Sequence, residues 1–310
     1  MSRFLVIGDL ALDVTVAPAR PMLAGGDVPA TIRLGPGGQA ANVAVRLARR
    51  GEQVTLAAAV GEDAAGELLR RAMAADGVEL LALPASRSVT VVAMLDATGE
   101  RSMLSDRQTL RPEPLAAALN DAGWVHCSGY ALLDDDGGDR LAALLGGRPA
   151  GVPLSVAGGS VPREPARARR FLDRAATARP ELVVISRVEA ANLSGMTSGS
   201  ASSAARHLAG VADVVIVTDG PLGAAAHIRA AGEDGMAVEV AGASGESPVL
   251  DTTGAGDAFV AALIAELAPG GWPPSLARLE TAMTAAAAAG AAAARVVGAQ
   301  ARVPAEGTPR

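Results

Sequence analysis

Short runs of aliphatic and β-branched residues alternate six times with alanine-rich stretches of helical spacing, and this alternation is the strongest constraint on the fold. The strand-like runs are 4–7, 53–60, 124–127, 152–156, 182–185 and 214–217. The helical stretches are 39–50, 62–75, 112–120, 165–178, 202–208, 255–267 and 275–294. Such alternation is typical of βαβ units, in which helices cover both faces of a mainly parallel sheet. Because no linker interrupts it, the pattern predicts a single α/β domain over residues 1–310.

Two segments break the alternation. Residues 13–34 are rich in Pro and Gly, and residues 88–104 contain the polar turn 96–100. Both predict short antiparallel strands outside the parallel sheet. Such strands form either a flap over the carboxyl edge of the sheet, where ligands of open α/β folds bind, or surface hairpins without a role. The pattern alone leaves both interpretations open.

The composition excludes several classes of function. The net charge is −6 and all 27 basic residues are arginine. An acidic chain binds nucleic acid poorly, because non-specific affinity comes from neutralising phosphates. The absence of lysine excludes Walker-A phosphate binding, Schiff-base catalysis and Ser-x-x-Lys hydrolysis. No cationic leader or membrane-spanning run is visible, and the single Cys127 is expected to be a buried thiol, so we expect a cytoplasmic protein without nucleic-acid or membrane partners.

The string DTTGAGD at 251–257 stands directly before an apolar helical run and is the most informative motif. Glycines at a helix start expose backbone N–H groups to an anion, which the helix dipole also favours. Asp257, in the first turn, would lie beside that anion, and this suits a general base that deprotonates a hydroxyl attacking phosphorus. The alternative is that Asp251 and Asp257 are helix-capping residues.

A second glycine cluster, GPGGQAAN at 35–42, opens the first long helix. Its glycines remove side-chain bulk, and Asn42 offers both a donor and an acceptor to a polyhydroxylated ligand. Asp13 follows the first strand, near Asp9, where a carboxylate could bind hydroxyls. Alternatively, the glycines only form a loop that needs positive φ, and Asn42 is exposed on its helix. Asp9 and Asp13 would then lie in solvated turns.

Together with TDGPLG at 218–223, these motifs occur in the order seen in ribokinase-like (PfkB-type) carbohydrate kinases, and the chain resembles that family from about residue 4 to residue 303. The resemblance implies a ribokinase-like three-layer α/β sandwich with a small β lid built from 13–34 and 88–104. It implies ATP-dependent phosphorylation of a sugar hydroxyl, expected to be a hydroxymethyl group, with Mg²⁺ and K⁺ as further cofactors. In several members the lid also builds a homodimer.

The resemblance assigns a role to each matching position. Asp257 resembles the catalytic base, and the N–H groups of Gly254, Ala255 and Gly256 resemble the anion hole for the transferred phosphoryl group. The sugar contacts implied are Asp13, Gly37, Gly38, Asn42 and Asp257. The nucleotide contacts implied are Thr218, Gly220, Gly223, Gly254 and Gly256. Glu189 resembles the residue that organises Mg²⁺, and Asp251 and Thr253 resemble potassium-site residues.

The chain departs from the family pattern at several positions. Ser186 stands where the family's Asn-x-x-Glu motif has Asn, Ala11 replaces a sugar-binding Asn, and Gln39 replaces a Lys. No carboxylate follows the strand near 154–157. A nucleoside kinase is the main alternative, although neither lid segment holds an aromatic residue on which a base could stack. A sugar-binding protein that has lost turnover is a further one.

Overall fold

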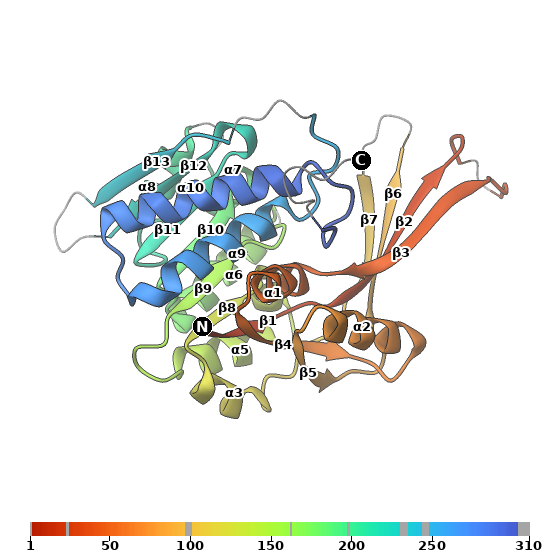
Figure 1. Ribbon diagram of the computed structural model, residues 1–310, viewed down its shortest axis with the longest axis horizontal. Coiled ribbons are helices and arrows are strands. Elements are labelled where there is room, and N and C mark those ends of the chain that lie inside the picture. The colour runs from red at the N-terminus through yellow and green to blue at the C-terminus, as the bar shows by residue number, and fades with distance from the viewer. Residues whose placement is uncertain are drawn as a thin grey trace.

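A nine-stranded sheet between two layers of helices forms the body of the protein (Figure 1). The structure is a computed structural model and describes residues 2–22, 25–96, 101–161, 163–196, 199–229, 235–243 and 248–302. The strand order is β13-β12-β11-β10-β9-β8-β1-β4-β5, and all neighbours are parallel except at β12 and β13. The strands are β1 Arg3–Ile7, β4 Gln53–Val60, β5 Glu79–Pro84, β8 Trp124–Cys127, β9 Leu154–Ala157, β10 Leu182–Ser186, β11 Val214–Thr218, β12 Ala224–Ile228 and β13 Met236–Val240.

Each face of the sheet is covered by its own helices and its own buried cluster, as expected for a sheet built from βαβ units. One face packs against α1 Gln39–Arg49, α2 Ala64–Ala75, α9 Ala255–Leu267 and α10 Leu276–Ala293. The other packs against α3 Leu115–Asp121, α4 Gly129–Leu133, α5 Gly138–Gly146, α6 Pro165–Ala178, α7 Arg187–Ser194 and α8 Ala201–His207. Two 3₁₀ turns, η1 Gly220–Leu222 and η2 Ala268–Gly270, complete the body.

The six strands and seven helices expected from the alternation are confirmed, with ends that differ by at most three residues. The alternation did not predict β5, β12, β13, α4, α5 or α7. These elements are short or exposed, so apolar periodicity marks them weakly. Cys127 is buried, as expected, and burial raises the pKa of its thiol.

The lid is a separate four-stranded sheet of order β3-β2-β6-β7, on the right in Figure 1. Its strands are β2 Ala11–Pro18, β3 Ala30–Gly37, β6 Val89–Leu95 and β7 Arg101–Asp106. The expectation of antiparallel strands is correct for the pairs β2–β3 and β6–β7, but the central pair β2–β6 is parallel. This correction follows from the topology, since β2 and β6 both run away from the carboxyl edge of the main sheet. The turn residues 97–100 lie outside the described residues.

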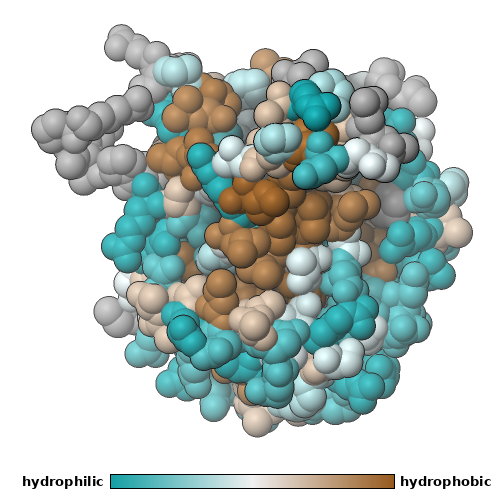
Figure 2. All heavy atoms as spheres, turned by 90° about the vertical axis from the view of Figure 1, so that its right-hand side faces the viewer, coloured by the Kyte–Doolittle hydropathy of each residue, from teal (hydrophilic) through white to brown (hydrophobic). Residues whose placement is uncertain are grey.

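The two faces of the lid differ in polarity because side chains alternate along each strand. The register aligns Val14 with Leu34 and Val92, and it aligns Val92 with Leu104, so these side chains share one face. Ile32, Leu34 and Leu104 are each about 60% exposed. Figure 2 shows the apolar area on this side of the molecule. Asp13 lies on the opposite face.

No helix within the described ranges is both long and apolar enough to cross a membrane. The 18-residue α10 is largely alanine and packs along α9.

Candidate active site

Residues that end or follow the parallel strands come together at the carboxyl edge of the sheet. Asp9 follows β1, Ser128 follows β8, and Gly158 follows β9. Ser186 and Thr218 are register partners at the ends of β10 and β11. Parallel strands end at one edge, so positions that lie far apart along the chain face the same space.

The glycine-led start of α9 forms one wall of this space. Gly254 is the N-cap residue with φ +76°, a conformation that favours glycine, and a Cβ on it would lie 2.9 Å from Ala299. A Cβ on Gly256 would meet nothing within 4 Å, so the first turn of α9 borders open space. The Ala255 N–H donates to Thr252 O at 3.2 Å, and the turn therefore uses one of the three expected anion-hole amides.

Asp257 is the third residue of α9 and is partly buried beneath this turn. Asn42 Nδ2 donates to Asp257 Oδ2 at 2.7 Å, and Gln300 Nε2 donates to Asn42 Oδ1 at 3.0 Å. Burial raises the pKa of Asp257 from 3.8 to about 7, while the Asn42 hydrogen bond and the charge of Arg46 oppose the rise. A carboxyl group with a pKa near neutrality can accept a proton from a hydroxyl at physiological pH.

Asp13 and the Gly37-Gly38 pair lie together where the lid joins α1. A Cβ on Gly37 would lie 2.0 Å from Asp13 Oδ2, so glycine at 37 makes room for this carboxylate. Burial, together with the nearby charge of Asp9, raises the pKa of Asp13 to about 6, while Arg107 lowers it. Gly38 has φ +98° and begins α1 without a capping side chain.

Asp9 supplies the missing cap and is a site residue that the sequence reasoning undervalued. Its carboxylate accepts from Gln39 N at 3.0 Å and, more weakly, from Ala40 N at 3.5 Å. Ser128 Oγ also donates to it, at 2.9 Å. Its charge raises the pKa of both Asp13 and Asp257, which places the three acids in one electrostatic cluster. The sequence signals for Asp9 were its place two residues after the buried strand β1 and the glycine at the N-cap of α1, which has no side chain to cap the helix.

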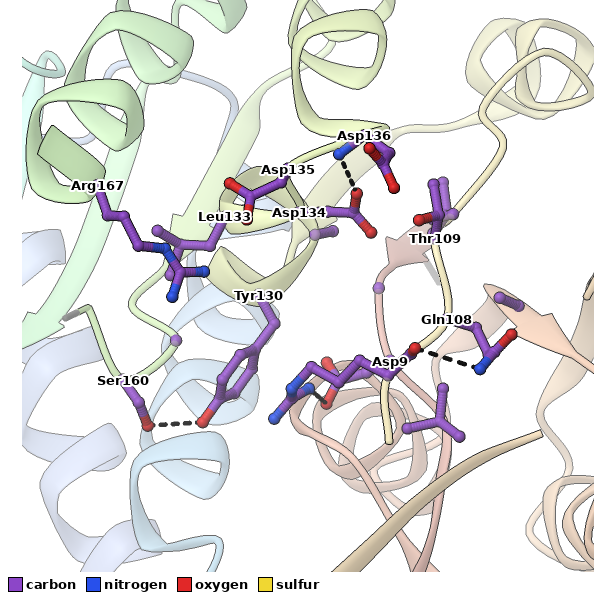
Figure 3. Close-up of a pocket in the computed structure, with 17 residues that line it drawn as sticks. Asp9, Gln108, Thr109, Tyr130, Leu133, Asp134, Asp135, Asp136, Ser160 and Arg167 are labelled. Carbon is purple, nitrogen blue, oxygen red and sulfur yellow. Dashed lines mark hydrogen bonds and ion pairs between the residues drawn. The ribbon is translucent and has the colours of Figure 1, made fainter. Parts of the chain in front are cut away.

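A cavity of about 370 Å³ lies beside Asp9 and is shown in Figure 3. The Arg107 guanidinium lies over the Tyr130 ring, 3.7 Å from its centroid, and is 3.6 Å from Asp9 Oδ2. Tyr130 Oη and Ser160 Oγ are 2.6 Å apart. Sequence analysis does not single out Arg107 or Tyr130, because neither belongs to a motif.

Glu189 is fixed by four hydrogen bonds. Its Oε1 accepts from Gly159 N and Ser160 N, and its Oε2 accepts from the N and Oγ of Ser186, all at 2.8 Å. The bond from Ser186 N, together with the Glu189 N–H that donates to Ser186 Oγ at 3.3 Å, forms the capping box of α7, so Ser186 holds Glu189 where the family has Asn. A Cβ on Gly158 would lie 2.3 Å from Glu189, so the loop after β9 wraps this carboxylate.

The expected nucleotide residues follow β11. Thr218 ends the strand, Gly220 begins η1, and a Cβ on Gly220 would meet nothing within 4 Å. Gly223 packs differently, because a Cβ there would lie 2.1 Å from Val240 O. Gly220 therefore borders open space, whereas Gly223 is needed for the approach of β13.

Asp251 joins the loop before α9 to the chain after α10. Its Oδ1 accepts from Thr253 N at 2.9 Å and from Thr253 Oγ1 at 2.6 Å, while its Oδ2 accepts from Gly298 N at 2.9 Å. In the part of the chain that the structure describes, no three His, Cys, Asp or Glu side chains cluster as a metal cage. Mg²⁺ is commonly held by one or two carboxylates, water and substrate phosphates. A site with the single carboxylate of Glu189, and without a three-residue cage among the described residues, fits that mode of binding.

A doubly covered parallel sheet, a β lid at its carboxyl edge and a partly buried acid on a glycine-led helix define a ribokinase-like fold. The sequence model of the pfkB family carbohydrate kinases matches residues 1–306, and the chain belongs to that family. A Klebsiella pneumoniae fructokinase is 34% identical over 287 residues, covering 87% of this chain and 89% of the relative.

Two solved structures illustrate the likeness of the fold. The ribokinase of Arabidopsis thaliana, complexed with ribose and ATP, has a TM-score of 0.78 at 23% identity and covers 96% of this chain and 94% of that one. The fructokinase of Xylella fastidiosa with bound ATP has a TM-score of 0.79 at 24% identity, with the same coverage of both chains. The expectation of a ribokinase-like carbohydrate kinase is confirmed.

Proposed function

We propose that this carbohydrate kinase transfers the γ-phosphate of ATP to a hydroxymethyl group of a small sugar, with Asp257 as the general base. The observation that supports this most is the position of Asp257: a partly buried carboxyl group with a pKa of about 7, in the first turn of a helix whose start borders open space. A base must lie beside the acceptor hydroxyl and be unprotonated near the working pH.

In the proposed reaction the acceptor oxygen forms a bond to the γ-phosphorus while the bond to the β,γ-bridging oxygen breaks. The hydroxyl proton passes to the Asp257 carboxylate, and ADP leaves. The N–H groups of Gly254, Ala255 and Gly256 stabilise the negative charge on the transferred group, and a single preorganised donor is worth about 3 to 4 kcal/mol in comparable sites. For Ala255 this requires that its amide turn from Thr252 O to the phosphate.

The proposed sugar site lies between Asp13 and Asp257. Asp13, Gly37, Gly38 and Asn42 would bind hydroxyls, and the cavity beside Arg107 would receive the end of the sugar that does not react. A nucleobase would need an aromatic face, and the Arg107 guanidinium covers one face of the Tyr130 ring. The name of the Klebsiella relative makes fructose the first sugar to test.

Thr218, Gly220 and Gly223, with Gly254 and Gly256, would line the nucleotide. When bound with ATP, Mg²⁺ would neutralise phosphate charge, and Glu189 would orient its water ligands. Because four hydrogen bonds already occupy the acceptor positions of Glu189, this requires that one of these donors, such as Ser186 Oγ, give way to a water ligand. Asp251 and Thr253 would shape a potassium site, because Asp251 ties this loop to Gly298.

The apolar face of the lid supports a homodimer in which two lids pack together. Ile32, Leu34 and Leu104 are large, exposed and aligned on one face. A contiguous apolar area of this kind marks an interaction site more often than a free surface. Light scattering should show a dimer, and Leu34→Ser with Leu104→Ser should give monomers; a monomeric parent protein would contradict this proposal.

A melting-temperature screen of sugars and nucleosides, with a non-hydrolysable ATP analogue present, tests the proposed substrate class. A ligand at 100 times its Kd adds about 2.7 kcal/mol of stability. We expect fructose or another small sugar to raise the Tm. A response to nucleosides and to no sugar would favour a nucleoside kinase, and binding of a sugar without turnover would favour a protein that has lost catalysis.

A further inference from the structure

Two buried side-chain atoms between α1 and the segment after α10 have no hydrogen-bond partner within the residues that the structure describes. They are Arg46 Nε, which is a donor, and Gln300 Oε1, which is an acceptor. Buried polar atoms are nearly always paired, so this donor and this acceptor call for an explanation. Neither side chain has a role in the reaction proposed above.

The two side chains are brought together by contacts between α1 and residues 298–301. Arg46 Nη2 donates to Ala299 O at 2.7 Å. Gln300 Nε2 donates to Asn42 Oδ1 at 3.0 Å, and Asn42 lies one turn before Arg46 on α1. Arg46 Nε therefore lies beside Gln300 Oε1, and a small rotation of either side chain would join the donor to the acceptor.

These contacts form a chain of hydrogen bonds that ends on the proposed base. Gln300 donates to Asn42, and Asn42 Nδ2 donates to Asp257 Oδ2 at 2.7 Å. A guanidinium can only donate hydrogen bonds, and an ionised carboxylate can only accept them. With Arg46 at one end and Asp257 at the other, each amide between them satisfies both of its neighbours in only one orientation.

The opposite orientation of the two amides would favour a protonated Asp257. If the Asn42 amide turned over, its oxygen would face the carboxyl group and accept its proton. The Asn42 NH₂ group would then need Gln300 Oε1, and this would turn the Gln300 NH₂ group toward Arg46 Nε. Two buried donors that face each other both stay unpaired, which costs free energy. Arg46 therefore disfavours the orientation that stabilises the protonated acid.

We propose that Arg46 and Gln300 are positioning residues for the base, because they fix the direction of the hydrogen bonds that end on Asp257 Oδ2. The carboxylate then has one oxygen held by the Asn42 NH₂ group and the other available to the acceptor hydroxyl. This proposal rests on the proposed function of Asp257, since neither Arg46 nor Gln300 touches the reacting atoms.

The charges around Asp257 show what the chain has to oppose. Burial raises the pKa of Asp257, and the charges of Asp9, which follows β1, and of Glu189, on α7, raise it further. The Asn42 hydrogen bond and the charge of Arg46, both on α1, lower the pKa. Loss of the correct Asn42 orientation should therefore raise the pKa of Asp257 above about 7.

The first test compares the pH dependence of kcat, with ATP and fructose, in the full-length parent protein, in Gln300→Met and in a matched control. Methionine keeps the length of the side chain and removes both polar atoms, so the Asn42 amide is free to turn over. We expect the acid limb to move up by about one pH unit, so that kcat falls roughly tenfold at pH 6 and by less than about twofold at pH 9. The control is Gln53→Met, on an exposed residue at the start of β4, and it should behave like the parent.

The second test needs neither substrate nor turnover. In protein labelled with ¹³C at aspartate, the carboxyl signal of Asp257 is identified by its loss in Asp257→Asn, and its titration gives the pKa. We expect this pKa to rise by about one unit in Gln300→Met. Gln300→Glu, which would pair with Arg46 and accept from the Asn42 NH₂ group, should raise it at least as much, and it keeps a polar side chain should Gln300→Met fail to fold.

An unmoved Asp257 pKa in these variants, or a kcat that falls equally at every pH, would overturn the proposal and show that Gln300 is only structural. A raised Asp257 pKa in Gln300→Met, together with a parent kcat that does not depend on pH, would have a different meaning. The chain would then still fix the orientation of Asp257, and the proposed role of Asp257 as the base would be what fails.

Discussion

Asn42 Nδ2 donates to Asp257 Oδ2 at 2.7 Å, although the two residues are 215 positions apart in the chain. The bond joins the first turns of α1 and α9, so the glycine cluster at 35–42 and the string at 251–257 form one site. It also orients one carboxylate oxygen, Oδ2, and leaves Oδ1 for the proton transfer that we propose.

Replacing Asp257 by Asn should remove the proposed base while keeping the side-chain shape. We expect kcat to fall by roughly two to four orders of magnitude, the usual share of acid–base catalysis, with little change in sugar binding. A coupled ADP-release assay measures the rate, and calorimetry measures the binding. Asp121→Asn, on the exposed end of α3, is the matched control, and an unchanged rate in Asp257→Asn would rule out this residue as the base.

The pH dependence of kcat follows from the raised pKa of Asp257. The base acts only when ionised, so kcat should rise with pH and level off above about 7. A base with the ordinary aspartate pKa of 3.8 would already be ionised, so kcat would not rise with pH between 5.5 and 9. Steady-state rates between pH 5.5 and 9, with saturating substrates, test this, and a flat profile would contradict it.

Stability should respond to the same carboxyl group with a defined sign. The unfolded chain releases the Asp257 proton near pH 3.8, whereas the folded protein keeps it until about pH 7. Raising the pH between these values therefore lowers the free energy of unfolding, because only the unfolded chain has released the proton, and the loss is on the order of 4 kcal/mol once complete. Asp257→Asn avoids this loss.

We expect the Asp257→Asn variant to unfold at higher urea than the parent protein at pH 8, and at similar urea at pH 4. This is the trade of stability for activity that is common at catalytic residues. Urea titrations at the two pH values, without ligands, measure it. A variant less stable than the parent at pH 8 would show that ionised Asp257 does not destabilise the folded protein.

Much of this site could be predicted from the sequence because its parts are local. The start of α9, the start of α1 and the strands of the main sheet each follow from neighbouring residues. The parallel pairing of β2 with β6 did not follow, because it depends on how two segments about 75 residues apart leave the same sheet edge. Periodicity within a segment contains no information about its partner's direction.

The residues that were missed act across the fold. Arg107 and Tyr130 contact each other only after β7 and β8 have been placed, and the role of Asp9 requires the N-terminus of α1 to lie against it. Glu189 illustrates the same limit. Its motif was visible, but the four hydrogen bonds that fix it come from two loops that meet only in three dimensions.

Gly254 and Gly256 should respond differently to alanine. Gly254→Ala adds a Cβ at φ +76° and 2.9 Å from Ala299, so both stability and kcat should fall, the stability by about 1 to 3 kcal/mol. Gly256→Ala adds a methyl group to open space, so its Tm should stay close to that of the parent while kcat falls about tenfold or more. Each variant is the other's control, and a fully active Gly256→Ala would show that the open space is not the phosphoryl site.

Glu189→Gln should separate a structural role from a metal role. The amide would turn an NH₂ group toward donors at Ser186 or at Gly159 and Ser160, so the free energy of unfolding should fall by about 1 to 3 kcal/mol. If Glu189 orients the water ligands of Mg²⁺, the Mg²⁺ concentration for half-maximal rate should also rise by about tenfold or more. Glu113→Gln, on an exposed ion pair with Arg140, should change neither quantity. A destabilised Glu189→Gln variant with an unchanged Mg²⁺ requirement would show that Glu189 only caps α7. Binding of Mg²⁺ would then not involve Glu189 and would rest on the nucleotide phosphates.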